Sequence, residues 1–134
     1  MGEKKVLNAG DLKQKIFAAK DTELQPMEIP EWEVTIYIKP LTYDERNKAL
    51  DAYRVTADPE DEMVTAEQVK GFHMALMIEG VRDSEGNPIF TQADIERLSD
   101  KSSGVLDRIA TRITELSGFG PELRREMKRR FRSR

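Results

Sequence analysis

The residue types that most often carry out catalysis are scarce in this sequence. The chain has 134 residues, with one histidine, His73, and no cysteine. Thiol nucleophiles, disulfides and cysteine-ligated zinc sites are therefore excluded. A lone histidine on an apolar helical stripe is more often a core or rim residue than a base, and no HExxH pattern supplies a second metal ligand. We expect no catalytic site and no metal site.

Phosphate-binding glycine loops are absent as well, because neither GxxxxGK nor GxGxxG occurs. Carboxylates cluster at residues 58–62 and again at residues 83–86, and such groups suit hard cations. Neither cluster has the ligand order and closing glutamate of an EF-hand. We interpret the first as a solvated connection and the second as a turn. The prediction is a protein that is not an enzyme and that uses no cofactor.

Charge is distributed unevenly along the chain. Residues 121–134 hold seven Lys or Arg against two Glu, a net charge of +5, so the first 120 residues carry −8 of the total of −3. Such a basic segment can bind phosphates without reading sequence, but an acidic body repels a polyanion. A small nucleic-acid-associated regulator or adaptor that uses this segment therefore remains the alternative function. Nucleic acid is the disfavoured partner, and contact with protein is preferred.

The N-terminal residues carry charges where a signal peptide needs an apolar core, and no apolar run approaches the roughly 20 residues of a membrane span. We therefore expect a protein of the cytoplasm with no membrane partner. The length suits one domain with one modest core. We expect the domain to cover residues 1–120 and to be followed by a basic C-terminal helix or tail over residues 121–134.

Apolar periodicity predicts the elements of that domain. Trp32, Val34, Ile36 and Ile38 alternate with polar residues, which indicates a strand over 32–39, and the prolines before it favour an extended entry. Turn residues between 80–82 and 88–90 predict a small hairpin. Helices are expected over 12–20 after Asp11, 42–54, 66–79, 91–98 and 103–117. The fold class is α+β, a small, mainly antiparallel sheet or hairpin packed with about five helices in a single domain.

Cap signals support several of these helices. Thr42 with Glu45 has the spacing of a capping box, and Thr91 with Asp94 resembles one. Ser102 or Ser103 can begin the helix over 103–117, and Gly118 follows its last apolar residue as a stop. The helix over 66–79 has the broadest apolar face, so we expect it to be the central core helix.

The order of these segments resembles the small tail assembly chaperones of long-tailed bacteriophages and prophages. The likeness is carried by the strand in WEVTIYIKPLTYDERNKAL, the helix AEQVKGFHMALMIEGV, the turn RDSEGNPIFTQADIERL and the helix SSGVLDRIATRITELSGF. The family's turn pattern falls on Val81, Asp83, Gly86, Pro88 and Phe90, and its closing Leu-Ser-Gly falls on Leu116, Ser117 and Gly118. The likeness spans roughly residues 10–120.

The resemblance implies a non-enzymatic factor of tail morphogenesis. Members of the family bind the tape measure protein before tail tube subunits polymerise around it, and they are absent from the finished virion. The implied partners are thus the tape measure protein and the tail tube protein, with self-association as a further alternative, in the cytoplasm of the host cell. The resemblance supplies no catalytic residues to carry over.

Reversible contact with apolar helical surface suits methionine and aromatic side chains, which can repack. The helix over 66–79 offers Met77, and the loop after Gly118 offers Phe119. Leu123, Met127 and Phe131 form a thin stripe at helical spacing in the basic segment, too narrow to need a core of its own. The candidate partner-binding residues are Met77, Phe119, Leu123, Arg124, Arg125, Met127, Lys128, Arg129, Arg130 and Phe131.

Overall fold

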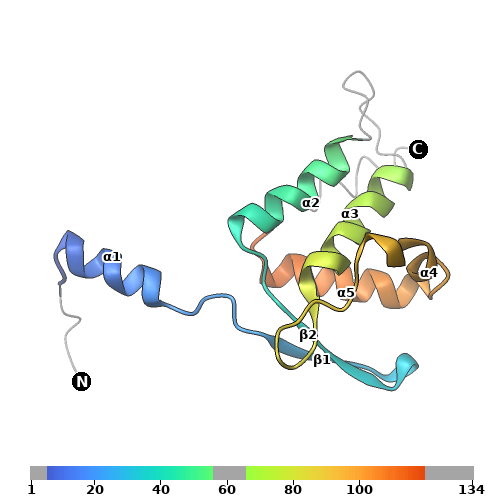
Figure 1. The fold of residues 1–134 in the computed structure, drawn as a ribbon, viewed down its shortest axis with the longest axis horizontal. Helices are drawn as coiled ribbons and strands as arrows, with labels where there is room; N and C mark the ends of the chain where they lie inside the picture. Colours follow the sequence, from blue (N-terminus) through green and yellow to red (C-terminus); the bar gives the residue numbers. More distant parts are fainter. Residues whose placement is uncertain (1–5, 56–65, 120–134) are drawn as a thin grey trace.

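A computed structural model describes residues 6–55 and 66–119 of the chain. Along these residues lie five α-helices and three short strands (Figure 1). The helices are α1 (Ala9–Ala18), α2 (Tyr43–Val55), α3 (Ala66–Gly80), α4 (Ile95–Ser99) and α5 (Ser103–Leu116). The strands are β1 (Gln25–Ile29), β2 (Val34–Ile38) and β3 (Val81–Arg82). The predicted α+β class, with a small sheet and about five helices, is confirmed.

The sheet is antiparallel throughout, with strand order β1-β2-β3. β1 pairs with β2 from Gln25 opposite Ile38 to Ile29 opposite Val34. The sequence analysis expected only an extended entry before β2, so it missed β1. β1 contains Pro26 and lies at the edge of the sheet. Proline, which lacks a backbone N–H, is tolerated there because an N–H on the outer side of an edge strand is not needed for pairing.

The strand predicted over 32–39 begins two residues later than expected. Trp32 belongs to a short 3-10 helix, Pro30–Trp32, and Glu33 follows it in the left-handed region at a φ of 54°. This tight connection turns the chain from β1 back into β2. Ile36 and Ile38 are buried as the alternation predicted, whereas Val34, at the end of the pairing, is 47% exposed.

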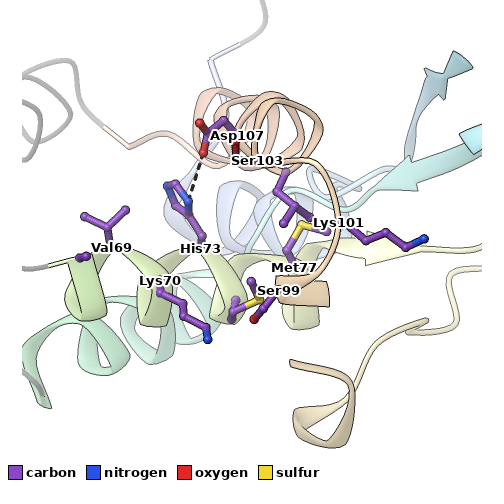
Figure 2. A pocket seen from close by; sticks show the side chains of 11 residues that line it. Val69, Lys70, His73, Met77, Ser99, Lys101, Ser103 and Asp107 are labelled. Atoms are coloured by element: carbon purple, nitrogen blue, oxygen red, sulfur yellow. Dashed lines mark ion pairs between the residues drawn. The ribbon is translucent and has the colours of Figure 1, made fainter. Parts of the chain in front are cut away.

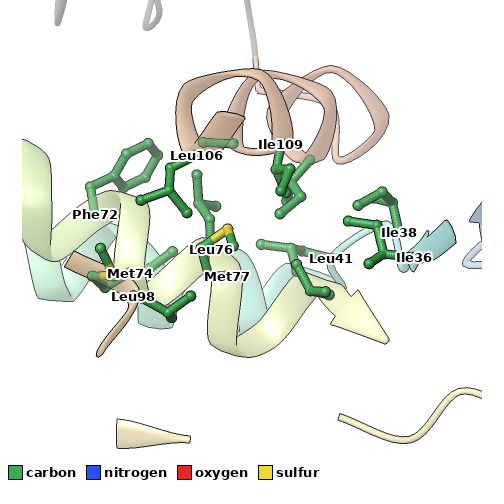
Figure 3. Close-up of a cluster of buried hydrophobic side chains, with 14 of the residues drawn as sticks. Ile36, Ile38, Leu41, Phe72, Met74, Leu76, Met77, Leu98, Leu106 and Ile109 are labelled. Atoms are coloured by element: carbon green, nitrogen blue, oxygen red, sulfur yellow. The ribbon is translucent and has the colours of Figure 1, made fainter. Parts of the chain in front are cut away.

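The core lies between the sheet and the helices α2, α3 and α5 (Figure 3). α3 is central to it, as predicted, since Phe72, Leu76 and Met77 are all buried between its neighbours. Buried side chains from the other elements complete the cluster, among them Ile29, Ile36, Ile38, Leu41, Leu50, Val81, Leu98, Leu106, Ile109 and Ile113. Burial of this apolar surface is the main source of stability.

Two glycines let the helices approach α3 closely. A Cβ on Gly80 would lie 2.9 Å from Ile113 Cδ1 of α5, and one on Gly71 would lie 3.2 Å from the Ala52 carbonyl oxygen of α2. Glycine has no side chain at these crossings, so backbone and side chains of the neighbouring helices fill the space instead. The C-terminal end of α3 is thereby held against α5.

Apart from the cap expected at Asp11, the helix caps predicted within the described residues are present. Glu45 N–H donates to Thr42 Oγ1 at 3.2 Å and Thr42 N–H donates to Glu45 Oε1 at 2.9 Å, which is a complete capping box. Thr91 and Asp94 form a second box at the start of a 3-10 helix, Gln92–Asp94, so the helix predicted over 91–98 begins as a 3-10 turn and becomes α4 only at Ile95. Ser102 accepts from Val105 N–H at the start of α5, and Gly118 ends that helix with a φ of 73°. These local signals place the helix ends close to where the sequence put them.

The predicted hairpin after α3 exists in a reduced form. Arg82 bridges to Pro88, and Ile89 N–H donates to the Val81 carbonyl. The Asp83 carboxylate accepts the backbone N–H of Asn87 at 2.9 Å, its side-chain amide at 3.1 Å and the backbone N–H of Glu85 at 2.9 Å. These bonds, those from Asn87 above all, lower the pKa of Asp83 below its ordinary value. The residues considered as a weak calcium loop are therefore organised as a turn by their own backbone.

The first helix differs most from expectation. It was predicted over 12–20 after an Asp11 cap, but it covers Ala9–Ala18, because the Asn8 side chain accepts the Asp11 N–H and caps it three residues earlier. None of its residues is buried, and Ile16 and Phe17 are 65% and 78% exposed. Figure 1 shows α1 (blue) standing apart from the other helices at the end of an extended segment. Amphipathic periodicity predicted the helix but not a partner for its apolar face.

Candidate partner-binding groove

An open groove of about 370 Å³ runs between α3 and the first turns of α5 (Figure 2). α3 contributes one of its walls through side chains three or four positions apart, which share a face of the helix. The end of α4, the loop after it and the start of α5 contribute the opposite wall. The lining residues are Ala66, Val69, Lys70, His73, Met74, Met77, Ser99, Lys101, Ser103, Leu106 and Asp107.

The deep side of the groove is apolar. Met74, Met77 and Leu106 are buried core residues whose side chains also form part of the lining, and Val69 packs partly buried beside them. Methionine is unbranched and polarizable, so it adapts its shape to a neighbouring surface. This floor can therefore accept apolar groups of varied shape.

The edges of the groove are charged. Lys70 on α3 and Lys101 before α5 are exposed, and no ion pair joins either lysine to an acidic residue within the described ranges. Asp107 is the carboxylate among the lining residues, and it lies 3.5 Å from Nδ1 of His73. α5 also begins at this edge, and its first turn holds no acidic residue. The helix dipole adds positive potential there.

His73 lies at the rim of the groove, partly buried, as its place on the α3 stripe suggested. Burial lowers the pKa of His73, and the negative charge of Asp107 opposes that shift without cancelling it. The imidazole is therefore neutral at pH 7. It contacts the Phe72 ring beside it, with the ring centroids 6.3 Å apart.

Serine, histidine and aspartate occur together in this groove, which raises the question of a nucleophilic triad. A working triad needs the hydroxyl hydrogen-bonded to the histidine and the histidine hydrogen-bonded to the acid. Ser99 Oγ donates to the Ile95 carbonyl instead, and no bond joins Ser103 to His73 in the part of the chain that the structure describes. Together with the 3.5 Å His73–Asp107 separation, this arrangement does not assemble a nucleophile.

Metal-binding geometry is also lacking among residues 6–55 and 66–119, where no three His, Asp or Glu side chains gather around a common point. The acidic stretch 58–62 lies outside the described residues. In the same ranges no helix is long and apolar enough to cross a bilayer.

Of the ten binding residues predicted from the sequence, two lie among the residues that the structure describes. Met77 has no exposed surface and forms part of the groove floor. Phe119 is 3% exposed, and its ring lies edge-on to Phe72, 5.6 Å between centroids. Both therefore belong to the core in this conformation, and their contact with a partner stays a prediction. The other eight candidates lie in residues 123–131, outside the described residues.

Sequence reasoning missed the lysines and the α5 side of the groove. Spacing along α3 predicted one broad apolar stripe of Val69, Phe72, His73, Leu76 and Gly80, widened by Met74, Met77 and Ile78. Of these residues, Val69, His73, Met74 and Met77 line the groove. The opposite wall could not be inferred, because it depends on how α5 packs across α3.

The comparisons agree with this architecture. Residues 11–129 match the family described as phage tail assembly chaperone. The fold resembles the solved structure of the bacteriophage HK97 tail assembly chaperone, with a TM-score of 0.56 and 15% sequence identity over 79% of this chain and 97% of that one. No curated protein matches the sequence. Since the family match extends over most of the sequence, the chain belongs to the phage tail assembly chaperone family.

Proposed function

We propose that this chaperone binds the tape measure protein and helps to recruit tail tube subunits, acting without catalysis in the host cytoplasm and leaving before the virion is complete. Membership of the family supports the general role. The observation that carries the molecular proposal is the open groove between α3 and α5, with an apolar floor and charged edges. Such a groove suits an amphipathic helix laid along it.

The dimensions of the groove support a helical partner. Its α3 wall runs from Ala66 to Met77, which corresponds to about 16 Å, or three helical turns. A helix of this length presents apolar side chains at i, i+3, i+4 and i+7 along one face. Methionine-lined floors accept such faces without strict shape matching, which suits a factor that must release its partner.

The test is co-expression of the tagged chaperone with the tape measure protein of the same phage. The variant Ser103→Trp places a bulky ring at the exposed start of α5, inside the groove lining. The matched control Thr111→Trp places the same ring at an exposed position of α5 outside the lining. We expect the wild type and Thr111→Trp to retain the tape measure protein and Ser103→Trp to lose it. Failure of the wild type to retain it would overturn the proposal.

The predicted stripe of Leu123, Met127 and Phe131, with the arginines and lysine between, is proposed as a second contact with the same partner. Replacing the three apolar residues by serine in the full chain is expected to weaken retention while leaving thermal unfolding unchanged. Polyanion binding by the wild type, lost when residues 121–134 are removed, would instead favour the nucleic-acid alternative.

A further inference from the structure

The charged residues around the groove favour one kind of partner helix over another. Lys70 lies on the α3 side and Lys101 on the α5 side, so cationic groups stand on both walls (Figure 2). The N-terminal end of α5, with no acidic residue in its first turn, adds to the positive potential beside Lys101. The one lining carboxylate, Asp107, is next to His73. The rim therefore favours negative charge on an incoming chain.

This local preference is opposite to that of the protein as a whole. The chain has a net charge of −3, and its first 120 residues carry −8. Long-range attraction would therefore draw a basic partner to the body of the protein. A preference for acidic partners can arise only from charges placed locally, as those at the groove edges are.

We propose that the α3–α5 groove recognises an amphipathic helix whose apolar stripe is flanked by acidic residues. Apolar side chains of that helix lie on the floor, against Val69, Met74 and Leu106, and its flanking carboxylates meet Lys70, Lys101 and the start of α5. The inference rests on the proposed function, because it specifies the chemistry of the partner that fills the same groove.

Segments of this chain fit the groove less well than such a partner. α1 has an exposed apolar face at Leu12, Ile16 and Phe17, but Lys13 and Lys15 stand among those residues. Docking α1 of a second copy would bring cations to a cationic rim. The basic segment 121–134 has the same disadvantage, with seven Lys or Arg. Like charges brought together in this way weaken binding.

Two fluorescently labelled helical peptides test the proposal. They share one apolar stripe of leucine and alanine, and the positions beside the stripe are glutamate in one and lysine in the other. We expect the full-length protein to bind the glutamate peptide about tenfold more tightly, as two partly exposed charge pairs allow. The preference should decrease as salt is added, because exposed charges are screened.

The double variant Lys70→Glu/Lys101→Glu should reverse the preference. The control Lys13→Glu/Lys48→Glu changes the net charge by the same amount at exposed positions of α1 and α2, outside the groove lining, and should keep the wild-type preference. All four lysines are exposed, so the variants should unfold at the wild-type temperature. Equal binding of the two peptides, tighter binding of the lysine peptide, binding of neither, or an unaltered preference in the groove variant overturns the inference.

The peptide and co-expression results separate the two proposals. Retention of the tape measure protein without discrimination between the peptides overturns this inference and leaves the proposed function in place. Discrimination between the peptides without retention of the tape measure protein supports the groove chemistry and overturns the proposed function.

Discussion

The guanidinium of Arg108 on α5 forms a bidentate ion pair with the carboxylate of Glu31. Arg108 Nη1 and Nη2 donate to the two Glu31 oxygens at 2.8 and 2.7 Å, across 77 residues of sequence. Glu31 lies in the short 3-10 helix that joins β1 to β2. The pair therefore ties the connection between β1 and β2 to α5. Bidentate geometry makes it stronger and more directional than a single contact.

The titration of Glu31 reports this pair. The hydrogen bonds from Arg108, aided by a backbone bond and by the charge of the arginine, lower the pKa of Glu31 from 4.5 to about 2. Because the pKa of Glu31 is lower in the native state than in the unfolded chain, the ionised carboxylate stabilises the native state at pH values above 4.5. This contribution is lost as the pH falls toward 2. We predict that Arg108→Gln returns the pKa of Glu31 most of the way to 4.5, measured by NMR of the carboxyl carbon. A pKa that stays near 2 in this variant would contradict the assignment.

His73 should make the protein sensitive to mild acid. Burial lowers its pKa below the ordinary 6.5, so the unfolded chain binds a proton more readily than the native one. Its contribution to stability is therefore present above pH 6.5 and decreases as the pH falls below that value. We predict a smaller loss of stability in His73→Gln over this range, measured by urea unfolding at a series of pH values. In Asp107→Asn the pKa of His73 should fall further, because the opposing carboxylate is removed.

The crossing of α3 and α5 should not tolerate a methyl group at Gly80. The added Cβ would lie 2.9 to 3.1 Å from three side-chain carbons of Ile113. Ile113 is completely buried, so its side chain cannot move aside into solvent. We predict that Gly80→Ala lowers the free energy of unfolding by about 1–3 kcal/mol. Ile113→Val removes Cδ1, so it should cost less in the Gly80→Ala background than in the wild type. Strictly additive effects in this double-mutant cycle would argue against the contact.

Identical substitutions on α1 and α5 should have very different effects. Ile16 is 65% exposed on a helix with no buried residue, whereas Ile109 is completely buried. We predict that Ile16→Ala changes the free energy of unfolding by less than about 0.5 kcal/mol and that Ile109→Ala costs about 2–5 kcal/mol. Chemical denaturation of both variants measures this directly. A large cost at Ile16 would show that α1 packs against the body in solution.

Ser117 should stabilise the fold through its hydroxyl. Its Oγ accepts the backbone N–H of Leu41 at 2.9 Å, 76 residues away in sequence, and Leu41 is buried. Ser117→Ala leaves that donor without this acceptor, which is expected to cost about 1–3 kcal/mol. Ser117→Thr keeps an oxygen at the same place and should restore most of the loss. Equal stability of the alanine and threonine variants would refute the role.

Local sequence signals predicted the helix starts well, but they did not predict β1 or the exposure of α1. The Thr42–Glu45 and Thr91–Asp94 boxes define helix starts because cap and first turn lie within four residues of each other. The sequence did not predict β1 because an edge strand depends on its neighbour for pairing, and because Pro26 within the strand and Pro30 directly after it weaken the strand signal. For α1 the periodicity was correct, yet exposure of its apolar face could not be read from spacing alone.

The groove, too, could be predicted from the sequence only on one side. The α3 side of the groove was visible in the sequence, because residue spacing placed Val69 and His73 on one apolar stripe with Met77 beside it. Lys101 and Asp107 join that stripe only through the packing of α5 across α3, which Gly80 permits by its lack of a side chain. Phe119, a candidate contact residue, packs against Phe72 and is 3% exposed, and its contact with a partner stays a prediction.

Residue order was enough to predict the helices, the central place of α3, the α+β class and the resemblance to tail assembly chaperones. Periodicity, caps and turn residues act over a few positions, so they are legible along the chain. Three features could be seen only in the folded chain, namely the β1 pairing, the exposure of α1 and the groove between α3 and α5. These features depend on contacts between residues far apart in sequence, whose geometry is set by how whole elements pack against each other.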